Sequence, residues 1–167
     1  MKKNIILPIT ACIVLIAAAA VSISKGNANK NVSIESTAVS GSDVIINEAD
    51  VTTEAAYYDY DVDGINVQFF AVKASDGTVR LALNTCQVCK GSPYAYFKQE
   101  GDSFVCQNCG NAFQTDYIGI EHGGCNPVPV TEEYYTSSNG EITVFAEFLS
   151  AYKDSFASWK KGIGDNS

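Results

Sequence analysis

The sequence has few basic side chains and a single histidine. Its 167 residues include 19 Asp+Glu against 11 Lys+Arg, for a formal net charge of -8, and Arg80 is the single arginine. Nucleic-acid binding needs clusters of Lys and Arg that neutralise phosphates, so no nucleic-acid partner is expected. His122 is the single histidine, which excludes catalysis that depends on two.

Motifs of common catalytic sites are also missing. The chain has no Gly-x-Ser-x-Gly motif and no phosphate-binding loop. Its carboxylates are scattered, and no general base accompanies a nucleophile. We therefore expect a carrier or binding protein, and not a conventional hydrolase or transferase.

An uncharged apolar segment lies near the amino terminus. Residues 5–24 form a 20-residue run without a charge, and a helix rising about 1.5 Å per residue would cross a hydrocarbon layer of ~30 Å. Two lysines precede the run, so the positive-inside rule places the amino terminus in the cytoplasm and the bulk of the chain outside. We predict a single-pass signal anchor in the cell membrane over residues 1–24. Small residues at 18–20 and 26–28 leave a cleaved, secreted form as the alternative.

The next segment is polar and acidic. Residues 25–54 are rich in Ser, Thr, Asn and acidic residues and have few aromatics. Such a segment cannot bury enough apolar surface to offset the entropy lost on ordering. We predict a flexible acidic linker there, a folded metal-binding domain over residues 55–160 and a tail over residues 161–167.

The predicted domain carries two hairpin patterns and one helical pattern. Residues 65–74 and 78–85 read as paired strands around a Ser-Asp-Gly turn, and residues 94–99 with 103–105 read as a second hairpin. Each hairpin leads directly into a pair of cysteines. Apolar residues at 3.6-residue spacing predict an amphipathic helix over residues 145–160, whose aromatics we assign to the core or to a docking face. The predicted fold class is α+β, mostly small β.

Six cysteines are the most informative feature of the chain. Cys12 lies in the apolar N-terminal run and is interpreted as a small apolar residue of it. Cys86, Cys89, Cys106 and Cys109 form two C-x2-C turns separated by sixteen residues, a spacing typical of a four-thiolate metal site built from zinc-ribbon or rubredoxin-like knuckles. Each turn directs two sulfurs to one point while its backbone N–H groups face them. We predict that these four cysteines bind a metal ion.

Two other uses of the cysteine pairs stay open. An oxidising compartment favours disulfides, and C-x2-C pairs act as redox dithiols in thioredoxin-like proteins. Each pair here follows a predicted strand, however, and no βαβ pattern surrounds it. Gly110, directly after the second pair, fits a knuckle that needs a positive φ.

A fifth cysteine lies in the glycine-rich segment Glu121-His122-Gly123-Gly124-Cys125-Asn126-Pro127. Four thiolates suit zinc, a single iron or an iron–sulfur cluster, and a structural zinc ribbon needs no fifth cysteine. Cys125 is therefore either a small buried residue, or a cluster ligand or redox partner near the metal. We expect His122 to be a surface residue and not a ligand.

Over residues 65–130 these motifs resemble a known bacterial family, the membrane iron–sulfur-containing FtrD-like proteins. The resemblance is carried by Asn84-Thr85-Cys86-Gln87-Val88-Cys89, by Gly101-Asp102 with Val105-Cys106-Gln107-Asn108-Cys109-Gly110, by Phe113 with Asp116, and by Gly123-Gly124-Cys125-Asn126-Pro127-Val128-Pro129. The last block is the most specific, because zinc ribbons in general lack it.

The resemblance implies an extracytoplasmic, membrane-tethered redox domain. Family members are associated with ferrous iron uptake systems that contain an iron permease, where the FtrD-like subunit handles electrons linked to ferroxidation. Carried over by motif, the candidate ligands are Cys86, Cys89, Cys106, Cys109 and Cys125. We therefore expect electron transfer linked to iron transport, with an iron–sulfur cluster or iron as cofactor and an iron permease or redox protein as partner. A zinc-containing ribbon that presents an interaction surface is the alternative, and a thiol–disulfide redox protein is the second alternative.

Overall fold

The computed structural model describes residues 41–163 of the chain. Its strands form three antiparallel sheets with the orders β2-β3-β4-β8, β1-β10-β9 and β5-β6-β7. The elements are, in chain order, β1 (Val44–Asn47), the 3-10 helix η1 (Glu48–Asp50), β2 (Ala56–Val62), β3 (Ile65–Lys73), β4 (Val79–Cys86), β5 (Phe97–Glu100), β6 (Ser103–Cys106), β7 (Ala112–Gln114), η2 (Thr115–Tyr117), β8 (Pro127–Pro129), β9 (Tyr135–Ser138), β10 (Glu141–Val144), α1 (Ala146–Ala151) and η3 (Lys153–Phe156).

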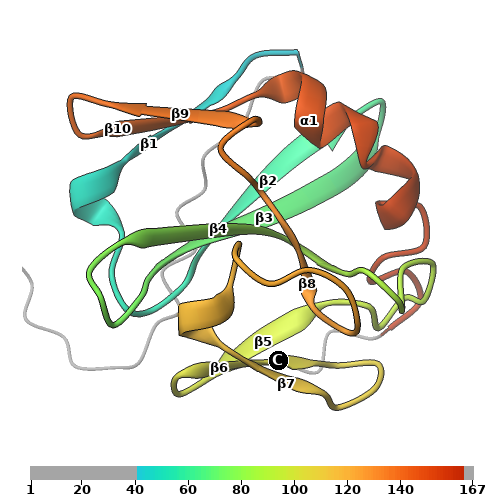
Figure 1. The fold of residues 1–167 in the computed structure, drawn as a ribbon. Coiled ribbons are helices and arrows are strands. Elements are labelled where there is room, and N and C mark those ends of the chain that lie inside the picture. The colour runs from blue at the N-terminus through green and yellow to red at the C-terminus, as the bar shows by residue number, and fades with distance from the viewer. Residues whose placement is uncertain (1–40, 164–167) are drawn as a thin grey trace, which may run out of the picture. The chain divides into compact units, whose positions relative to one another are not determined.

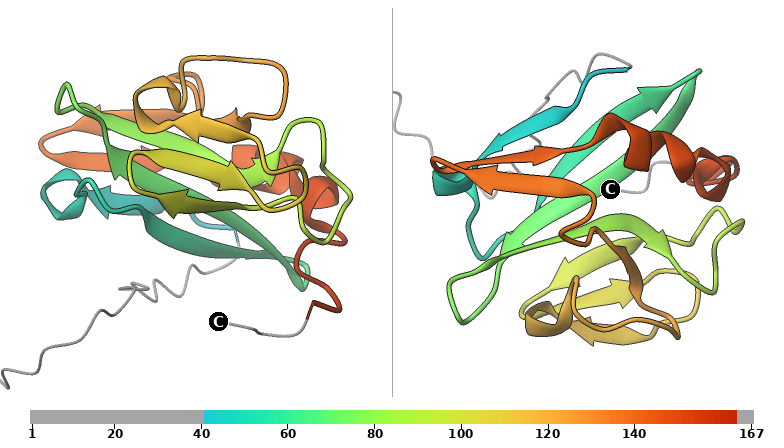
Figure 2. Two further views of the ribbon diagram at one scale, coloured as in Figure 1. Left: turned by 90° about the horizontal axis from the view of Figure 1, so that it is seen from below. Right: turned by 45° about the horizontal axis from the view of Figure 1, so that its top comes forward.

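The β2-β3-β4-β8 sheet is the middle of three layers, with β1, β9, β10 and α1 on one side and β5–β7 on the other (Figures 1 and 2). Along β3, Val67 and Phe69 enter one core while Phe70 and Val72 enter the other. Successive side chains of a strand point to opposite faces. A strand covered on both faces therefore needs a continuous apolar run, which explains the Phe-Phe-Ala-Val sequence at its centre.

The larger core lies on the face of the middle sheet that β1, β10, α1 and η3 cover. It contains 19 buried side chains, among them Tyr60, Phe69 and Leu149, each fully buried. Burying a large apolar side chain contributes roughly 1.5–3 kcal/mol. This layer can therefore be held together by apolar packing alone.

The smaller core lies between the opposite face of the middle sheet and β5-β6-β7. It contains ten buried side chains, of which two are the cysteines Cys86 and Cys106. The rings of Phe70 and Phe104 stack across it with their centroids 4.5 Å apart. Two of the four predicted metal ligands are thus part of the packing between two sheets.

Asn84 is a buried polar residue that links these layers. Its Oδ1 accepts a hydrogen bond from the backbone N–H of Phe97 at 2.7 Å, and its Nδ2 donates to Oε1 of Gln68 at 2.7 Å. Its carbonyl accepts from Nε1 of Trp159 at 2.8 Å. Buried polar groups are stable only when they are hydrogen-bonded in this way. Asn84 therefore joins β4 to β3, to β5 and to the C-terminal segment, two residues before Cys86.

The two predicted hairpins are confirmed. β3 pairs with β4 in the register Phe69↔Leu83, and β5 pairs with β6 in the register Phe97↔Cys106. β4 ends at Cys86 and β6 ends at Cys106, so each hairpin does deliver the chain into a cysteine turn.

Part of the predicted acidic linker is folded, and the prediction of flexibility is wrong for residues 44–51. β1 pairs with β10 in the register Val44↔Val144, and its residues alternate between buried and exposed. The side chain of Asn47 caps η1 by accepting from the backbone N–H of Ala49, and Val51 is 1% exposed. Pairing with a strand almost a hundred residues later orders this segment, and composition alone does not reveal such a partner.

The predicted helix over residues 145–160 is much shorter than expected. α1 spans six residues, and after Tyr152 the chain continues as η3 and turns. Serine and aspartate are frequent after residue 149, and their side chains compete for backbone hydrogen bonds within a helix. The apolar face is nevertheless buried as predicted, since Phe148, Leu149, Phe156 and Trp159 all belong to the larger core.

The predicted signal anchor over residues 1–24, Cys12 and residues 164–167 of the tail lie outside the described residues. Within residues 41–163, no helix has the length and apolar character needed to cross a membrane.

Candidate metal centre

The two C-x2-C turns share one backbone hydrogen bond. In the first turn, the N–H of Lys90 donates to the carbonyl of Cys86 at 3.0 Å, and in the second the N–H of Gly110 donates to the carbonyl of Cys106 at 2.8 Å. The N–H of Cys89 points at Sγ of Cys86, at 3.4 Å. Backbone N–H groups therefore face a sulfur in the first turn, as the motif predicts. Gly110 has a φ of 73°, which confirms the positive φ expected there.

The five cysteines of the domain come together in one cluster of free thiols. Two groups of three have sulfurs that all lie within 4.8 Å of one another. We call Cys86, Cys89 and Cys106 the inner triad, and Cys89, Cys109 and Cys125 the outer triad. Cys89 belongs to both. A tetrahedral ion with metal–sulfur bonds of about 2.3 Å needs sulfurs ~3.8 Å apart, so each triad is close to the spacing that a metal requires.

Gln87 attaches the segment that contains Cys125 to the first turn. Its backbone N–H donates to the carbonyl of Asn126 at 3.0 Å, and its Nε2 donates to the carbonyl of Pro127 at 3.2 Å. Its Oε1 accepts from the N–H of Gly123 at 3.2 Å. The C-x2-C motif specifies only its two cysteines, and Gln87 occupies one of the two unspecified positions between them. The sequence pattern therefore did not indicate this role. The three bonds explain how a loop from a distant part of the sequence brings a fifth sulfur to the cluster.

Burial separates Cys86 and Cys106 from the other three cysteines. Cys86 and Cys106 are 0% exposed, whereas Cys89 and Cys125 are half-buried and Cys109 is exposed. Desolvation raises the pKa of Cys86 to about 11 and the pKa of Cys106 to about 12, while backbone N–H groups of each turn act in the opposite direction. A buried thiol of this kind ionises when a cation compensates the thiolate charge. Cys86 and Cys106 thus form the side of the cluster that is shielded from water.

The pKa values of Cys109 and Cys125 shift in opposite directions. The pKa of Cys109 is lowered, first by a hydrogen bond from the backbone of Asn111 and then by its neighbouring thiols. The pKa of Cys125 is raised to about 11, first because its thiol is hydrogen-bonded to Cys109. Cys109 is therefore the more acidic member of this pair.

A family model described as "Membrane iron-sulfur containing protein FtrD-like" matches residues 51–156. The match covers more than half of the 167 residues and includes both C-x2-C turns and Cys125. The chain belongs to the FtrD-like family. No curated protein matches it.

The FtrD-like domain has a donor set that fits the iron–sulfur content named in the family description. Iron–sulfur centres are held by cysteine thiolates, and the cluster offers five thiols and no oxygen or nitrogen ligand among the described residues. The same donor set also suits zinc. The geometry therefore supports a metal centre in this FtrD-like domain without identifying the metal.

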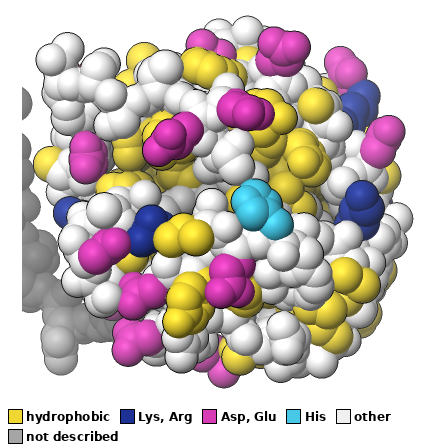
Figure 3. Space-filling view, viewed as in Figure 1, with side chains coloured by type: hydrophobic (Ala, Val, Ile, Leu, Met, Phe, Trp, Pro, Cys, Tyr) yellow, Lys and Arg dark blue, Asp and Glu magenta, His cyan; other side chains and the backbone are white. Residues whose placement is uncertain are grey.

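His122 is not part of the thiol cluster. It is exposed, in the loop that leads to Cys125, and belongs to neither triad. Figure 3 shows the histidine at the surface of a face on which carboxylates outnumber Lys and Arg. Its expected role as a surface residue fits this position.

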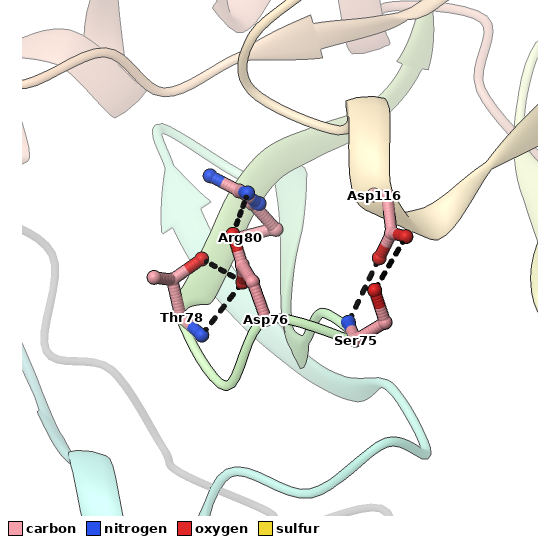
Figure 4. A network of polar contacts seen from close by, with 5 residues as sticks. All are labelled: Ser75, Asp76, Thr78, Arg80 and Asp116. Atoms are coloured by element: carbon pink, nitrogen blue, oxygen red, sulfur yellow. Dashed lines mark hydrogen bonds and ion pairs between the residues drawn. The ribbon is translucent and has the colours of Figure 1, made fainter.

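Figure 4 shows a polar network around Arg80 that contains none of the five cysteines. Arg80 pairs with Asp76 at 2.8 Å, while the carboxylate of Asp116 accepts from the N–H and the hydroxyl of Ser75 at 2.8 and 2.7 Å. The two bonds from Ser75 fasten η2 to the β3–β4 turn, and η2 precedes the loop of Cys125. A groove of about 560 Å³ beside Arg80 contains no cysteine in its lining.

Proposed function

We propose that the chain is a membrane-anchored, extracytoplasmic electron-transfer protein whose iron or iron–sulfur centre is held by Cys86, Cys89, Cys106 and Cys109. The observation that carries this proposal is the cluster of five thiols within two overlapping triads. Cys125 stands beside the four ligands as an additional thiol. The family description, which names a membrane iron–sulfur protein, supports the same proposal.

The cluster combines a buried side with an exposed side. Iron bound to thiolates supplies a reversible one-electron change. Cys86 and Cys106 shield one side of that centre from water, since neither has exposed surface. Cys109 is exposed and provides a side that a redox partner can approach.

Second-sphere groups of the chain support the thiolates. The N–H of Cys89 donates toward Sγ of Cys86, and the backbone of Asn111 donates to Cys109. Hydrogen bonds to a thiolate stabilise its charged form, and such contacts tune the potential of a thiolate-bound metal. A structural ribbon has no need of the additional thiol that Gln87 holds in place.

The membrane anchor and the partner are further parts of the proposal. The apolar run at residues 5–24 supplies the anchor, with the amino terminus in the cytoplasm. An iron permease or a redox protein is the proposed partner, in keeping with electron transfer linked to iron transport.

A structural zinc ribbon is the second candidate. It is favoured by the short sulfur separations, which are within 4.8 Å in each triad and close to the ~3.8 Å of a single tetrahedral ion. In this case the metal would hold β5-β6-β7 against the middle sheet, and the domain would act as an interaction module.

Anaerobic purification of the full chain separates the two candidates. Iron, zinc and acid-labile sulfide are measured per chain, together with the absorption spectrum. We expect iron and visible thiolate-to-iron absorbance. A colourless protein with one zinc would contradict the electron-transfer proposal and support the ribbon. The full chain is used because a shorter chain that begins at residue 55 would lack β1.

A matched pair of variants tests the ligand assignment. Cys89→Ser removes the one sulfur that both triads share and should reduce metal content to less than about a tenth. Cys12→Ser makes the same chemical change outside the C-x2-C turns and should retain the metal. Equal metal content in the two variants would remove Cys89 from the ligand set.

A further inference from the structure

The cluster contains one thiol more than a four-coordinate metal needs. The ligand set proposed above contains Cys86, Cys89, Cys106 and Cys109, so Cys125 is the thiol in excess. In the structure Cys109 groups with Cys89 and Cys125, and not with all three sulfurs of the inner triad. Cys125 lies within 4.8 Å of Cys109, and both are more accessible than the buried Cys86 and Cys106. The surplus thiol is thus placed beside the one exposed ligand.

We propose that Cys109 and Cys125 form a reversible disulfide that withdraws Cys109 from the metal and so controls metal occupancy. This inference rests on the proposed function, because it concerns the same four ligands. Nothing in the metal-binding role alone requires Cys125. The disulfide gives that residue a defined function.

Cys109 and Cys125 are better placed to close on each other than the buried thiols are, although Gln87 holds residues 123, 126 and 127 beside the first turn. Cys125 follows Gly123 and Gly124, whose φ values are 87° and 69°, and a Cβ on either glycine would meet no atom within 4 Å. A disulfide needs a sulfur–sulfur distance of about 2.05 Å, so closure from 4.8 Å or less asks for a shift of less than about 3 Å. An open glycine loop allows a shift of that size.

The buried thiols lack this freedom. Cys86 is paired with Pro127 in the middle sheet, and Cys106 is paired with Phe97 in the β5-β6-β7 sheet. Both side chains also pack in the smaller core. Moving either sulfur would break strand hydrogen bonds or open the core. Oxidation should therefore begin at the outer pair.

The reaction is a thiol–disulfide exchange with a small disulfide such as oxidised glutathione. The sulfur of Cys109 attacks one glutathione sulfur, the S–S bond of glutathione breaks, and one reduced glutathione leaves. The sulfur of Cys125 then attacks Cys109, and the second reduced glutathione leaves. Two protein sulfurs are oxidised and one glutathione disulfide is reduced. The proton of the Cys125 thiol passes to one glutathione, and the glutathione thiolate displaced by the metal-bound Cys109 thiolate takes its proton from water.

Loss of Cys109 leaves the inner triad as the remaining thiol ligands. Removal of groups that merely orient metal ligands already weakens metal binding by about 10–100-fold. Loss of a ligand itself should weaken binding by at least about tenfold. Oxidation is therefore expected to release metal, and reduction is expected to restore binding.

The test uses the full chain, loaded with metal and then treated with oxidised glutathione. Non-reducing peptide mapping by mass spectrometry locates the disulfides, and a coloured chelator follows metal release. Cys125→Ser should lose both the disulfide and the oxidant-dependent metal release. For each protein, the released metal is expressed as a fraction of the metal bound before oxidation. His122→Ala changes the same loop outside both triads and should behave as the parent chain.

The outcomes separate this inference from the proposed function. A Cys109–Cys125 disulfide, metal release, and recovery on reduction would support the inference. Disulfides at Cys86–Cys89 or Cys106–Cys109 instead, or equal release from Cys125→Ser, would overturn it. If the purified chain holds no iron, the proposed function fails, whereas peptide mapping of the metal-free chain still decides which thiols pair.

Discussion

The two cores of the domain are built differently, although they share the middle sheet. The larger core has 19 buried side chains, and the smaller core has ten, of which two are cysteines. Small apolar cores rarely supply enough stability on their own and are often completed by a metal or by disulfides. We infer that apolar packing maintains the larger core and that the metal maintains the smaller one. The difference indicates which part of the fold depends on the site.

The largest expected effect comes from removing a buried ligand. Cys106→Ser should abolish metal binding and unfold β5-β6-β7, because metal binding supplies about 10–16 kcal/mol to small zinc-dependent domains and the variant loses that contribution. Metal analysis and thermal unfolding check this. Cys12→Ser is the matched control and should leave both measurements unchanged. An unaltered melting temperature in Cys106→Ser would contradict the inference that the metal maintains the smaller core.

Replacing one aromatic residue by alanine in each core should lower the stability by similar amounts, but only one of the two variants should bind metal more weakly. Phe104→Ala removes the ring that stacks on Phe70 at 4.5 Å and should cost about 3–5 kcal/mol, with weaker metal binding. Phe156→Ala, in the larger core, should cost about the same but leave metal affinity unchanged at temperatures where the chain is folded. Denaturant titration and metal competition check the pair. Equal loss of metal affinity would mean that the cores are not separable.

Asn84 connects the two cores, and its loss should have a smaller effect. Asn84→Ala leaves the N–H of Phe97 and Oε1 of Gln68 without their partners and should cost about 1–3 kcal/mol. Asn84→Asp keeps the oxygen that accepts from Phe97 but loses the donor to Gln68, so the comparison separates the two bonds. Denaturant unfolding of both variants measures the difference. Full stability in Asn84→Ala would contradict a connecting role.

The smallest expected effect is at Asp116, on the surface. Hydrogen bonds from Ser75 hold the pKa of Asp116 below its ordinary value. A carboxyl whose pKa is lower in the folded chain than in the unfolded chain stabilises the fold at pH values above about 3.9, its pKa in the unfolded chain. This stabilisation is lost as the pH falls through the pKa of the folded chain. Asp116→Asn should therefore lower the melting temperature at pH 7 by at most about 4 °C.

The pH profile provides the control for Asp116. The difference between the parent chain and Asp116→Asn should shrink as pH falls below about 4. Ser75→Ala keeps the backbone N–H donor and loses the hydroxyl donor. Its melting temperature at pH 7 should therefore lie between those of the parent chain and Asp116→Asn. A difference that is constant from pH 7 to pH 2 would rule out this carboxylate as its source.

Local signals in the sequence predict the parts of the fold that local interactions determine. The turn residues and alternating patterns predict both hairpins, and the spacing of Cys86, Cys89, Cys106 and Cys109 predicts two matching knuckles. These features depend on residues close together in the chain. The approach of Cys86, Cys89 and Cys106 could be expected from this spacing.

Features that depend on distant partners could not be predicted in this way. β1 is a four-residue strand whose partner, β10, begins at Glu141. Gln87 binds three groups in residues 123–127, and no sequence pattern marks that contact. The helix over residues 145–160 was overestimated because the apolar spacing is the same whether the chain is α-helical throughout or changes to 3-10 turns after Tyr152.

Hydrogen exchange before and after metal removal tests the dependence of the smaller core on the site most directly. In the full chain, chelation should accelerate exchange of the backbone amides of β5 and β6 by at least about tenfold, while the paired amides of β2 and β3 stay protected. Equal acceleration in all of these strands, or none in any of them, would contradict the view that the thiol-bound metal maintains the smaller core alone.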